Sequence, residues 1–122
     1  MAGRKVLVVD DDKYVCDVVK LMLEKKGCEA VIISDGEATV ENAEAEKPDL
    51  ILLDITLHDI SGFKVLERLK NNPTTEKIPV VMMTGREDYA SMARARGLMA
   101  DDYLTKPFLS DELFEKISKY FK

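Results

Sequence analysis

The sequence predicts an α/β domain in which a doubly wound, parallel five-stranded sheet is covered by helices on both faces. Short apolar segments alternate along the chain with segments of helical periodicity. The apolar runs at residues 6–9 and 50–53 contain no alternating polar residues, which is typical of strands buried on both faces. Connections are short, and no Ser/Gly-rich linker or internal repeat interrupts the 122 residues. We therefore expect residues 1–122 to form one domain with right-handed crossovers.

The strands are predicted from their composition and from the breakers beside them. They are rich in Val, Ile and Leu, which favour a pleated, buried surface. Pro48 ends the preceding helix and leads into the third strand. Pro79 is tolerated near the start of the fourth strand, where the first residue need not donate a hydrogen bond. The five predicted strands occupy residues 5–10, 29–33, 48–54, 78–84 and 102–105.

The helices are predicted from apolar residues at helical spacing and from capping residues. Asp12 can cap the first helix, and Gly27 is a natural end for it. Ser110 is predicted to cap the last helix, in which Leu113, Ile117 and Phe121 recur every four residues on one face. The five predicted helices occupy residues 12–26, 37–46, 63–69, 87–96 and 111–121.

Charge and composition exclude several classes of protein. The net charge is −5, whereas surfaces that bind nucleic acid or anionic membranes carry basic patches. No apolar run approaches the ~20 residues of a membrane-spanning helix. Cys16 and Cys28 lack metal-ligand spacing, and reduced thiols are the simplest interpretation. The sequence therefore predicts a cytoplasmic protein without direct contact to nucleic acid or membrane.

Polar residues stand at the carboxyl ends of four predicted strands. Asp10 and Asp11 follow the first strand, Asp54 ends the third, Thr84 ends the fourth, and Lys106 follows the fifth. In a parallel sheet these ends meet at one edge, where open α/β sheets bind ligands. Two carboxylates ~4 Å apart repel by about 4 kcal/mol at an effective dielectric of 20, so protons, a cation or the lysine must offset the repulsion. An all-oxygen set suits Mg²⁺, although the first two acids alone are equally typical of a helix cap beside a solvated acid.

Four motifs make the chain resemble, over essentially its whole length, a receiver domain of the two-component response regulators, of the single-domain chemotaxis type. The resemblance implies a flavodoxin-like fold with strand order 2-1-3-4-5 and a phosphorylation-activated signalling function, with no output domain attached. The family often has a proline where His58, the only histidine, stands. We interpret His58 as an exposed loop residue and assign it no role. The motifs are Val8-Val9-Asp10-Asp11-Asp12, Leu50-Ile51-Leu52-Leu53-Asp54, Met83-Thr84-Gly85 and Asp102-Tyr103-Leu104-Thr105-Lys106-Pro107-Phe108.

The resemblance also implies a phosphoacceptor and a magnesium site. Asp54 is expected to accept a phosphoryl group from a histidine kinase or a histidine phosphotransfer protein. Asp11 is expected to bind Mg²⁺ directly and Asp10 mainly through water. The carboxylate of Asp54 and the backbone carbonyl of Thr56 would complete the protein ligands. Such a domain catalyses only its own phosphoryl transfer and dephosphorylation, so no turnover of a foreign substrate is expected.

A switch is implied by the same resemblance. Lys106, which precedes a cis bond to Pro107 in the family, would pair with the phosphoryl group, and the Thr84 hydroxyl would donate to it. As Thr84 moves towards the phosphate, Tyr103 would take the space it leaves. The surface of the fourth helix, fifth strand and fifth helix would then bind a protein partner, continue a phosphorelay or form a phosphorylation-dependent dimer of an otherwise monomeric chain.

Three other functions were weighed against these residues. A phosphatase of the haloacid-dehalogenase type needs an aspartate two residues after its nucleophile, where Thr56 stands. A flavodoxin-like FMN carrier needs a Ser/Thr/Gly-rich phosphate loop after the first strand, where residues 10–12 would repel a phosphate that arrives without metal. An EF-hand fails because Tyr14 occupies the fifth position of the loop.

Overall fold

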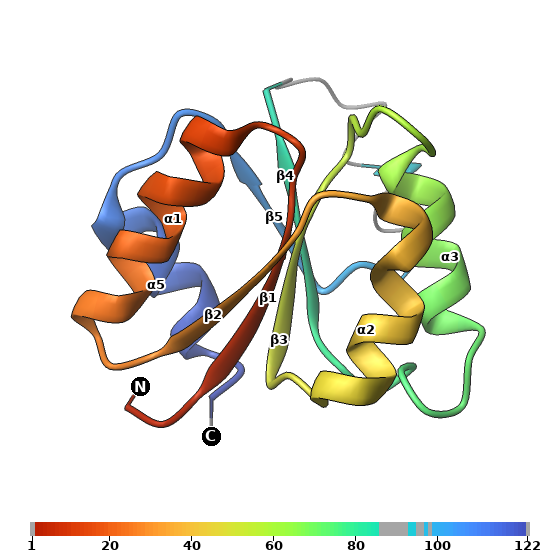
Figure 1. The fold of residues 1–122 in the computed structure, drawn as a ribbon, viewed down its shortest axis with the longest axis horizontal. Helices are drawn as coiled ribbons and strands as arrows, with labels where there is room; N and C mark the ends of the chain where they lie inside the picture. The colour runs from red at the N-terminus through yellow and green to blue at the C-terminus, as the bar shows by residue number, and fades with distance from the viewer. Residues whose placement is uncertain (1, 86–92, 95–96, 98, 122) are drawn as a thin grey trace.

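The five predicted strands form one parallel sheet in the order β2-β1-β3-β4-β5, as the sequence predicts. The computed structural model describes residues 2–85, 93–94, 97 and 99–121. Every neighbouring pair of strands is parallel, so all carboxyl ends lie at the edge that is uppermost in Figure 1. The strands are β1 (Lys5–Val9), β2 (Glu29–Ile33), β3 (Leu50–Asp54), β4 (Val80–Thr84) and β5 (Asp102–Thr105).

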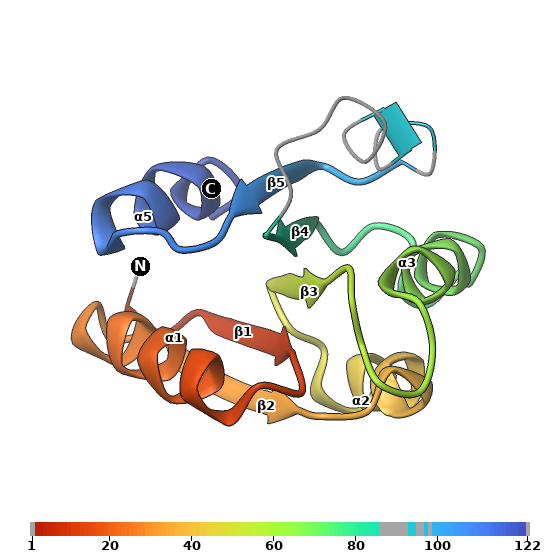
Figure 2. The same cartoon turned by 90° about the horizontal axis from the view of Figure 1, so that it is seen from above.

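Helices cover both faces of the sheet, which confirms the doubly wound arrangement. Figures 1 and 2 show α1 and α5 on one face and α2 and α3 on the other. A single 3₁₀ turn, η1 (Gly36–Ala38), precedes α2, so the helix predicted from residue 37 begins as a tighter turn. The helices are α1 (Lys13–Lys25), α2 (Thr39–Glu46), α3 (Gly62–Lys70) and α5 (Ser110–Ser118). The helix predicted over residues 87–96 falls mostly outside the described residues.

The core is two apolar layers, one on each side of the sheet. Along β1, Val6 and Val8 pack towards the α1/α5 layer, whereas Leu7 and Val9 pack towards the α2/α3 layer. All five residues of β3 and of β4 are buried. Burying each of their apolar side chains contributes about 1.5–3 kcal/mol, so the two central strands support the functional edge firmly.

Helix starts follow the predicted caps in one case and not in another. The Asp12 carboxylate accepts from the amides of Tyr14 and Val15, as predicted for α1. Ser110 is not the cap of α5, because Leu109 occupies that position and its amide donates to the Glu112 carboxylate instead. An acid three residues into a helix can satisfy the cap backbone by itself.

Two further boundaries differ from the prediction. The fourth strand begins at Val80 rather than at residue 78, because Pro79 has no N–H to give to a ladder. The last helix ends at Ser118, so Phe121 packs on the core from beyond the helix. Among the described residues, no helix is both long enough and apolar enough to cross a membrane.

Candidate functional site

The register of the sheet brings the predicted site residues to one edge. Val9 pairs with Leu53, so Asp10 follows β1 directly beside the end of β3, which is Asp54. On the other side, Thr84 and Thr105 pair at the ends of β4 and β5, and Lys106 comes next. The predicted convergence of these strand ends is confirmed.

Three carboxylates and one ammonium group meet at this edge. Carboxylate oxygens of Asp10, Asp11 and Asp54 all lie within 4.8 Å of one another. Asp10 and Asp54 are buried, whereas Asp11 is exposed. The Lys106 ammonium Nζ lies 2.7 Å from Oδ2 of Asp10 and 3.3 Å from Oδ2 of Asp54. One lysine thus faces three acids, and the cluster keeps an excess of negative charge.

Burial shifts the titration of the central acid and its lysine. The pKa of Asp54 is raised to about 6, chiefly by desolvation; the charge of Lys106 opposes the shift and that of Asp10 adds to it. Burial lowers the pKa of Lys106, but the ion pairs with Asp10 and Asp54 outweigh burial and raise it overall. Lys106 therefore stays charged, and Asp54 is a carboxylate held at an energetic cost.

Local hydrogen bonds fix the directions of the two buried acids. The Asp12 amide donates to Oδ1 of Asp10 at 2.9 Å, which leaves Oδ2 of Asp10 for Lys106. The Thr56 amide donates to Oδ1 of Asp54 at 3.2 Å. The buried thiol of Cys16 donates to the Asp10 carbonyl at 3.2 Å. Each acid thereby has one oxygen tied to the backbone and one directed to the cluster.

Gly62, the first residue of α3, permits the close approach of that helix to the end of β3. A Cβ built on Gly62 would lie 2.1 Å from the carbonyl oxygen of Asp54 and 2.7 Å from Cα of Ile55. The Gly62 amide also donates to the Ile55 carbonyl at 2.7 Å. Only glycine fits at this position without moving the backbone that carries Asp54.

Gly62→Ala is therefore expected to lower the free energy of unfolding by about 2–4 kcal/mol, because backbone rather than a movable side chain blocks the methyl group. Urea unfolding followed by circular dichroism measures this change. Gly97→Ala is the control, since nothing lies within 4 Å of a Cβ built there. Equal stability of the two variants would contradict the assigned close contact.

The donor set fits a small, hard divalent cation such as Mg²⁺. All three candidate ligands are carboxylates, and oxygen ligands are those that Mg²⁺ selects over the nitrogen and sulfur preferred by zinc or copper. The excess negative charge of the cluster favours the binding of a cation there. Residues 10, 11 and 54 thus meet the chemical requirement for the predicted site.

The remaining predicted residues lie at or beside the same edge. Thr84 is buried at the end of β4, and its carbonyl accepts from the Lys106 amide at 2.6 Å. Tyr103 is half-buried on β5, where the Lys116 ammonium lies 5.4 Å from the centre of its ring. The Lys106–Pro107 peptide bond is cis, as the resemblance implies. The roles predicted for Thr56, Thr84 and Tyr103 stay predictions.

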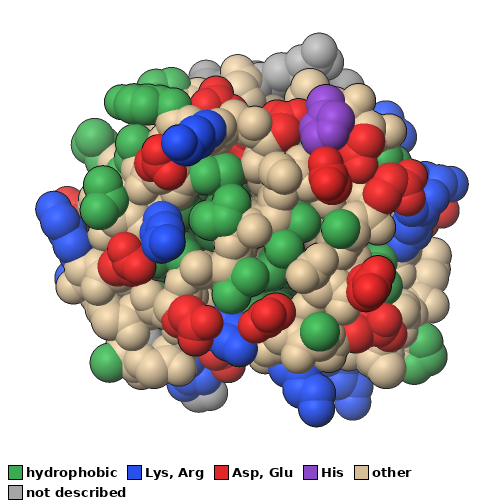
Figure 3. Space-filling view, viewed as in Figure 1, with side chains coloured by type: hydrophobic (Ala, Val, Ile, Leu, Met, Phe, Trp, Pro, Cys, Tyr) green, Lys and Arg blue, Asp and Glu red, His purple; other side chains and the backbone are tan. Residues whose placement is uncertain are grey.

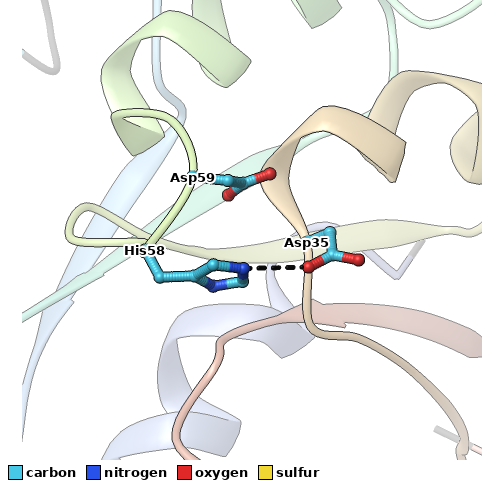
Figure 4. Close-up of side chains that lie close together, drawn as sticks. All are labelled: Asp35, His58 and Asp59. Atoms are coloured by element: carbon cyan, nitrogen blue, oxygen red, sulfur yellow. Dashed lines mark ion pairs between the residues drawn. The ribbon is translucent and has the colours of Figure 1, made fainter.

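His58 is the feature that sequence reasoning missed. Its ring lies between two carboxylates, with Nδ1 3.1 Å from Oδ2 of Asp11 and Nε2 3.1 Å from Oδ1 of Asp35. The hydrogen bond with Asp11, aided by the charges of Asp59, Asp35 and Asp11, raises the pKa of His58. Figure 4 shows the ring directed at Asp35, and Figure 3 shows the single histidine at the surface among acidic side chains. The residues come from three separate loops, so no sequence spacing connects them.

Comparison with known proteins decides the family. The profile of the response regulator receiver domain matches residues 6–118, which is most of the chain. The chain is a member of the response regulator receiver domain family. Its receiver domain is 39% identical over 115 residues to the phosphate regulon transcriptional regulatory protein PhoB of Escherichia coli, covering 94% of this chain and 50% of that protein. The chain thus spans about half the length of the curated relatives it matches.

Solved structures agree with this assignment. A putative response regulator from Chloroflexus aurantiacus superposes on this receiver domain with a TM-score of 0.91 and 29% identity, covering 96% of each chain. The receiver domain of the sensor histidine kinase PA1611 from Pseudomonas aeruginosa has a TM-score of 0.90 and 25% identity, covering 98% of each chain. That structure has a magnesium ion coordinated in its active-site cleft.

Proposed function

We propose that this receiver domain accepts a phosphoryl group on Asp54 from the phosphohistidine of a histidine kinase or a histidine phosphotransfer protein. One observation carries the proposal: the Asp54 carboxylate ends β3 in a cluster with Asp10, Asp11 and the Lys106 ammonium. An oxygen of Asp54 forms the new bond to phosphorus as the bond to the histidine nitrogen breaks. Phosphoryl transfer needs little beyond in-line positioning and neutralised charge, which such a cluster supplies.

The acidic side chains would hold Mg²⁺, as in the PA1611 receiver domain. Asp11 and Asp54 are the direct ligands together with the backbone carbonyl of Thr56, and Asp10 acts mainly through water. When bound, Mg²⁺ offsets the repulsion between the carboxylates and the incoming phosphoryl oxygens. Lys106 supplies a further positive charge as a mobile ammonium group, which the ion pairs with Asp10 and Asp54 keep next to the acceptor oxygen.

The phosphorylated domain signals through a protein surface. The Thr84 hydroxyl donates to the phosphoryl group, and Tyr103 follows into the space that Thr84 vacates. Lys116 of α5 already stacks on the Tyr103 ring, so movement of this ring is transmitted to α5. The surface of β5 and α5 then binds a protein target, passes the phosphoryl group on or pairs with a second copy; the predicted fourth helix, which would belong to the same surface, falls mostly outside the described residues.

The same chemistry limits what the domain does to other molecules. It transfers a phosphoryl group to itself and slowly releases it as phosphate in the cytoplasm, where its kinase resides. A dehalogenase-type phosphatase would need a general acid two residues after Asp54, and the hydroxyl of Thr56 is too weak an acid for that role. Transcriptional control, which the name of PhoB states, belongs to the whole of that protein.

Incubation with acetyl phosphate tests the proposal. With Mg²⁺ the protein is expected to gain the mass of one phosphoryl group, and hydroxylamine is expected to remove it because an acyl phosphate is a mixed anhydride that hydroxylamine cleaves at the carbonyl carbon. A chelator should prevent the gain. Intact-protein mass spectrometry measures the adduct, and peptide mapping after reduction with borohydride locates it. An adduct on any other residue, or one formed equally well with the chelator, would refute the proposal.

A further inference from the structure

His58 connects the proposed cation site to a second loop. The ring lies in the loop after β3, and its two nitrogens contact carboxylates from two other loops, Asp11 after β1 and Asp35 after β2. We name these three residues the Asp11–His58–Asp35 bridge. The side chain of His58 is 55% exposed, so the bridge lies over the rim of the site rather than inside it.

The backbone at the Asp35 end of this bridge is anchored, although the Asp35 side chain itself is 58% exposed. Asp59, next to the histidine in sequence, accepts from the amides of Gly36 and Glu37 at 3.0 Å each. Figure 4 shows Asp59 directed at the start of η1, directly after Asp35. A Cβ on Gly36 would lie 2.4 Å from Cγ2 of Ile60, so the two loops pack without space between them. The loop that carries His58 is therefore docked on the loop after β2, and the ring extends from there to Asp11.

The Asp11 end of the bridge is the one that carries a proposed cation ligand. The side chain of Asp10 has no exposed surface, whereas that of Asp11 is 30% exposed. An exposed carboxylate rotates freely unless something holds it, and ordering it when a cation binds costs conformational entropy. His58 holds Oδ2 of Asp11, which leaves Oδ1 for a cation shared with Asp10 and Asp54.

We propose that His58, anchored by Asp35, is a positioning residue that pre-orients the Asp11 carboxylate for Mg²⁺. The proposal rests on the function proposed above. Groups that hold a metal ligand from outside typically change metal affinity 10- to 100-fold when they are removed. Because this bridge is exposed, the lower end of that range, about ten-fold, is expected.

A positioning role and a purely electrostatic role of His58 predict opposite changes in the Mg²⁺ affinity of His58→Ala. A protonated imidazole repels Mg²⁺, so through charge alone His58→Ala would tighten Mg²⁺ binding and Asp35→Asn would weaken it. The variant carrying both changes would then bind like the unmodified protein. Through positioning, His58→Ala weakens binding, Asp35→Asn weakens it less, and the double variant binds as weakly as His58→Ala alone.

The experiment is a titration of each variant with MgCl₂ by isothermal titration calorimetry. His58→Ala and the double variant are expected to raise the dissociation constant about ten-fold. His58→Asn, which keeps a donor nitrogen in the place of Nδ1, should recover part of the loss. Arg68→Ala is the matched control, because it breaks an exposed ion pair with Glu37 in η1 without touching the bridge. Its affinity should equal that of the unmodified protein.

Three other outcomes would overturn either the positioning role or the proposed function. Mg²⁺ binding by His58→Ala as tight as in the unmodified protein, or tighter, overturns the positioning role. An equal loss in Arg68→Ala overturns it as well, since the effect would then be general loosening. Failure of the unmodified protein to bind Mg²⁺ would refute the proposed function instead. Thermal unfolding verifies that each variant is folded.

Discussion

Replacing Asp54 with asparagine is expected to abolish phosphorylation by acetyl phosphate completely. Asparagine keeps the shape of the side chain, but its amide is not a nucleophile towards phosphorus. The other oxygen ligands and Lys106 remain in place, so the loss is attributable to the acceptor alone. Intact-protein mass spectrometry in the presence of Mg²⁺ measures the effect.

The control for this experiment is Asp17→Asn, which removes an exposed carboxylate of α1. It should be phosphorylated at the rate of the unmodified protein. An Asp54→Asn protein that still gains one hydroxylamine-sensitive phosphoryl group would show that another carboxylate is the acceptor. Asp10 and Asp11 would then be the residues to replace next.

The same substitution is expected to stabilise the fold at neutral pH when no divalent cation is present. The pKa of Asp54 is raised from 3.8 to about 6, so its ionisation is harder in the folded than in the unfolded chain. At 1.36 kcal/mol per pH unit the cost approaches about 3 kcal/mol. This cost is absent below pH 3.8, where Asp54 is protonated in both the folded and the unfolded chain, and it is fully present above about pH 6. Asparagine, which cannot ionise, avoids the cost.

Urea unfolding in a chelating buffer tests this effect of pH. The free energy of unfolding of Asp54→Asn should exceed that of the unmodified protein by about 1–3 kcal/mol at pH 7. The difference should shrink as the pH falls towards 3.8, the ordinary pKa of aspartate. A variant that is less stable at pH 7, or a difference that does not change with pH, would mean that Lys106 fully compensates the buried charge.

The strand-end residues were predictable because a parallel sheet leaves little freedom. Once residues 6–9 and 50–53 are recognised as buried strands, their carboxyl ends must share an edge. The strand order implied by the family resemblance then places β1 next to β3, and Asp10 beside Asp54. Lys106 follows by the same rule from β5. The caps were less certain, because several polar residues compete at each helix start. At α5, Glu112 took the role expected of Ser110.

Contacts between loops could not be predicted from the sequence. The ring of His58 meets Asp35 only because the loops after β2 and β3 pack together through Gly36 and Ile60. That packing is a tertiary contact between segments more than 20 residues apart, and no local pattern indicates it. The need for glycine at position 62 was equally unpredictable, because it arises only from the close approach of the Asp54 carbonyl.

The ion pair between Lys106 and Asp10 joins residues separated by 96 positions. As the chain leaves the ribosome, the acids at the ends of β1 and β3 are therefore made long before their lysine. Until β5 has been synthesised and has joined the sheet, these acids face one another without their partner, and the half-made sheet is electrostatically disfavoured. Addition of the last strand therefore brings to this edge the ammonium group that offsets the repulsion.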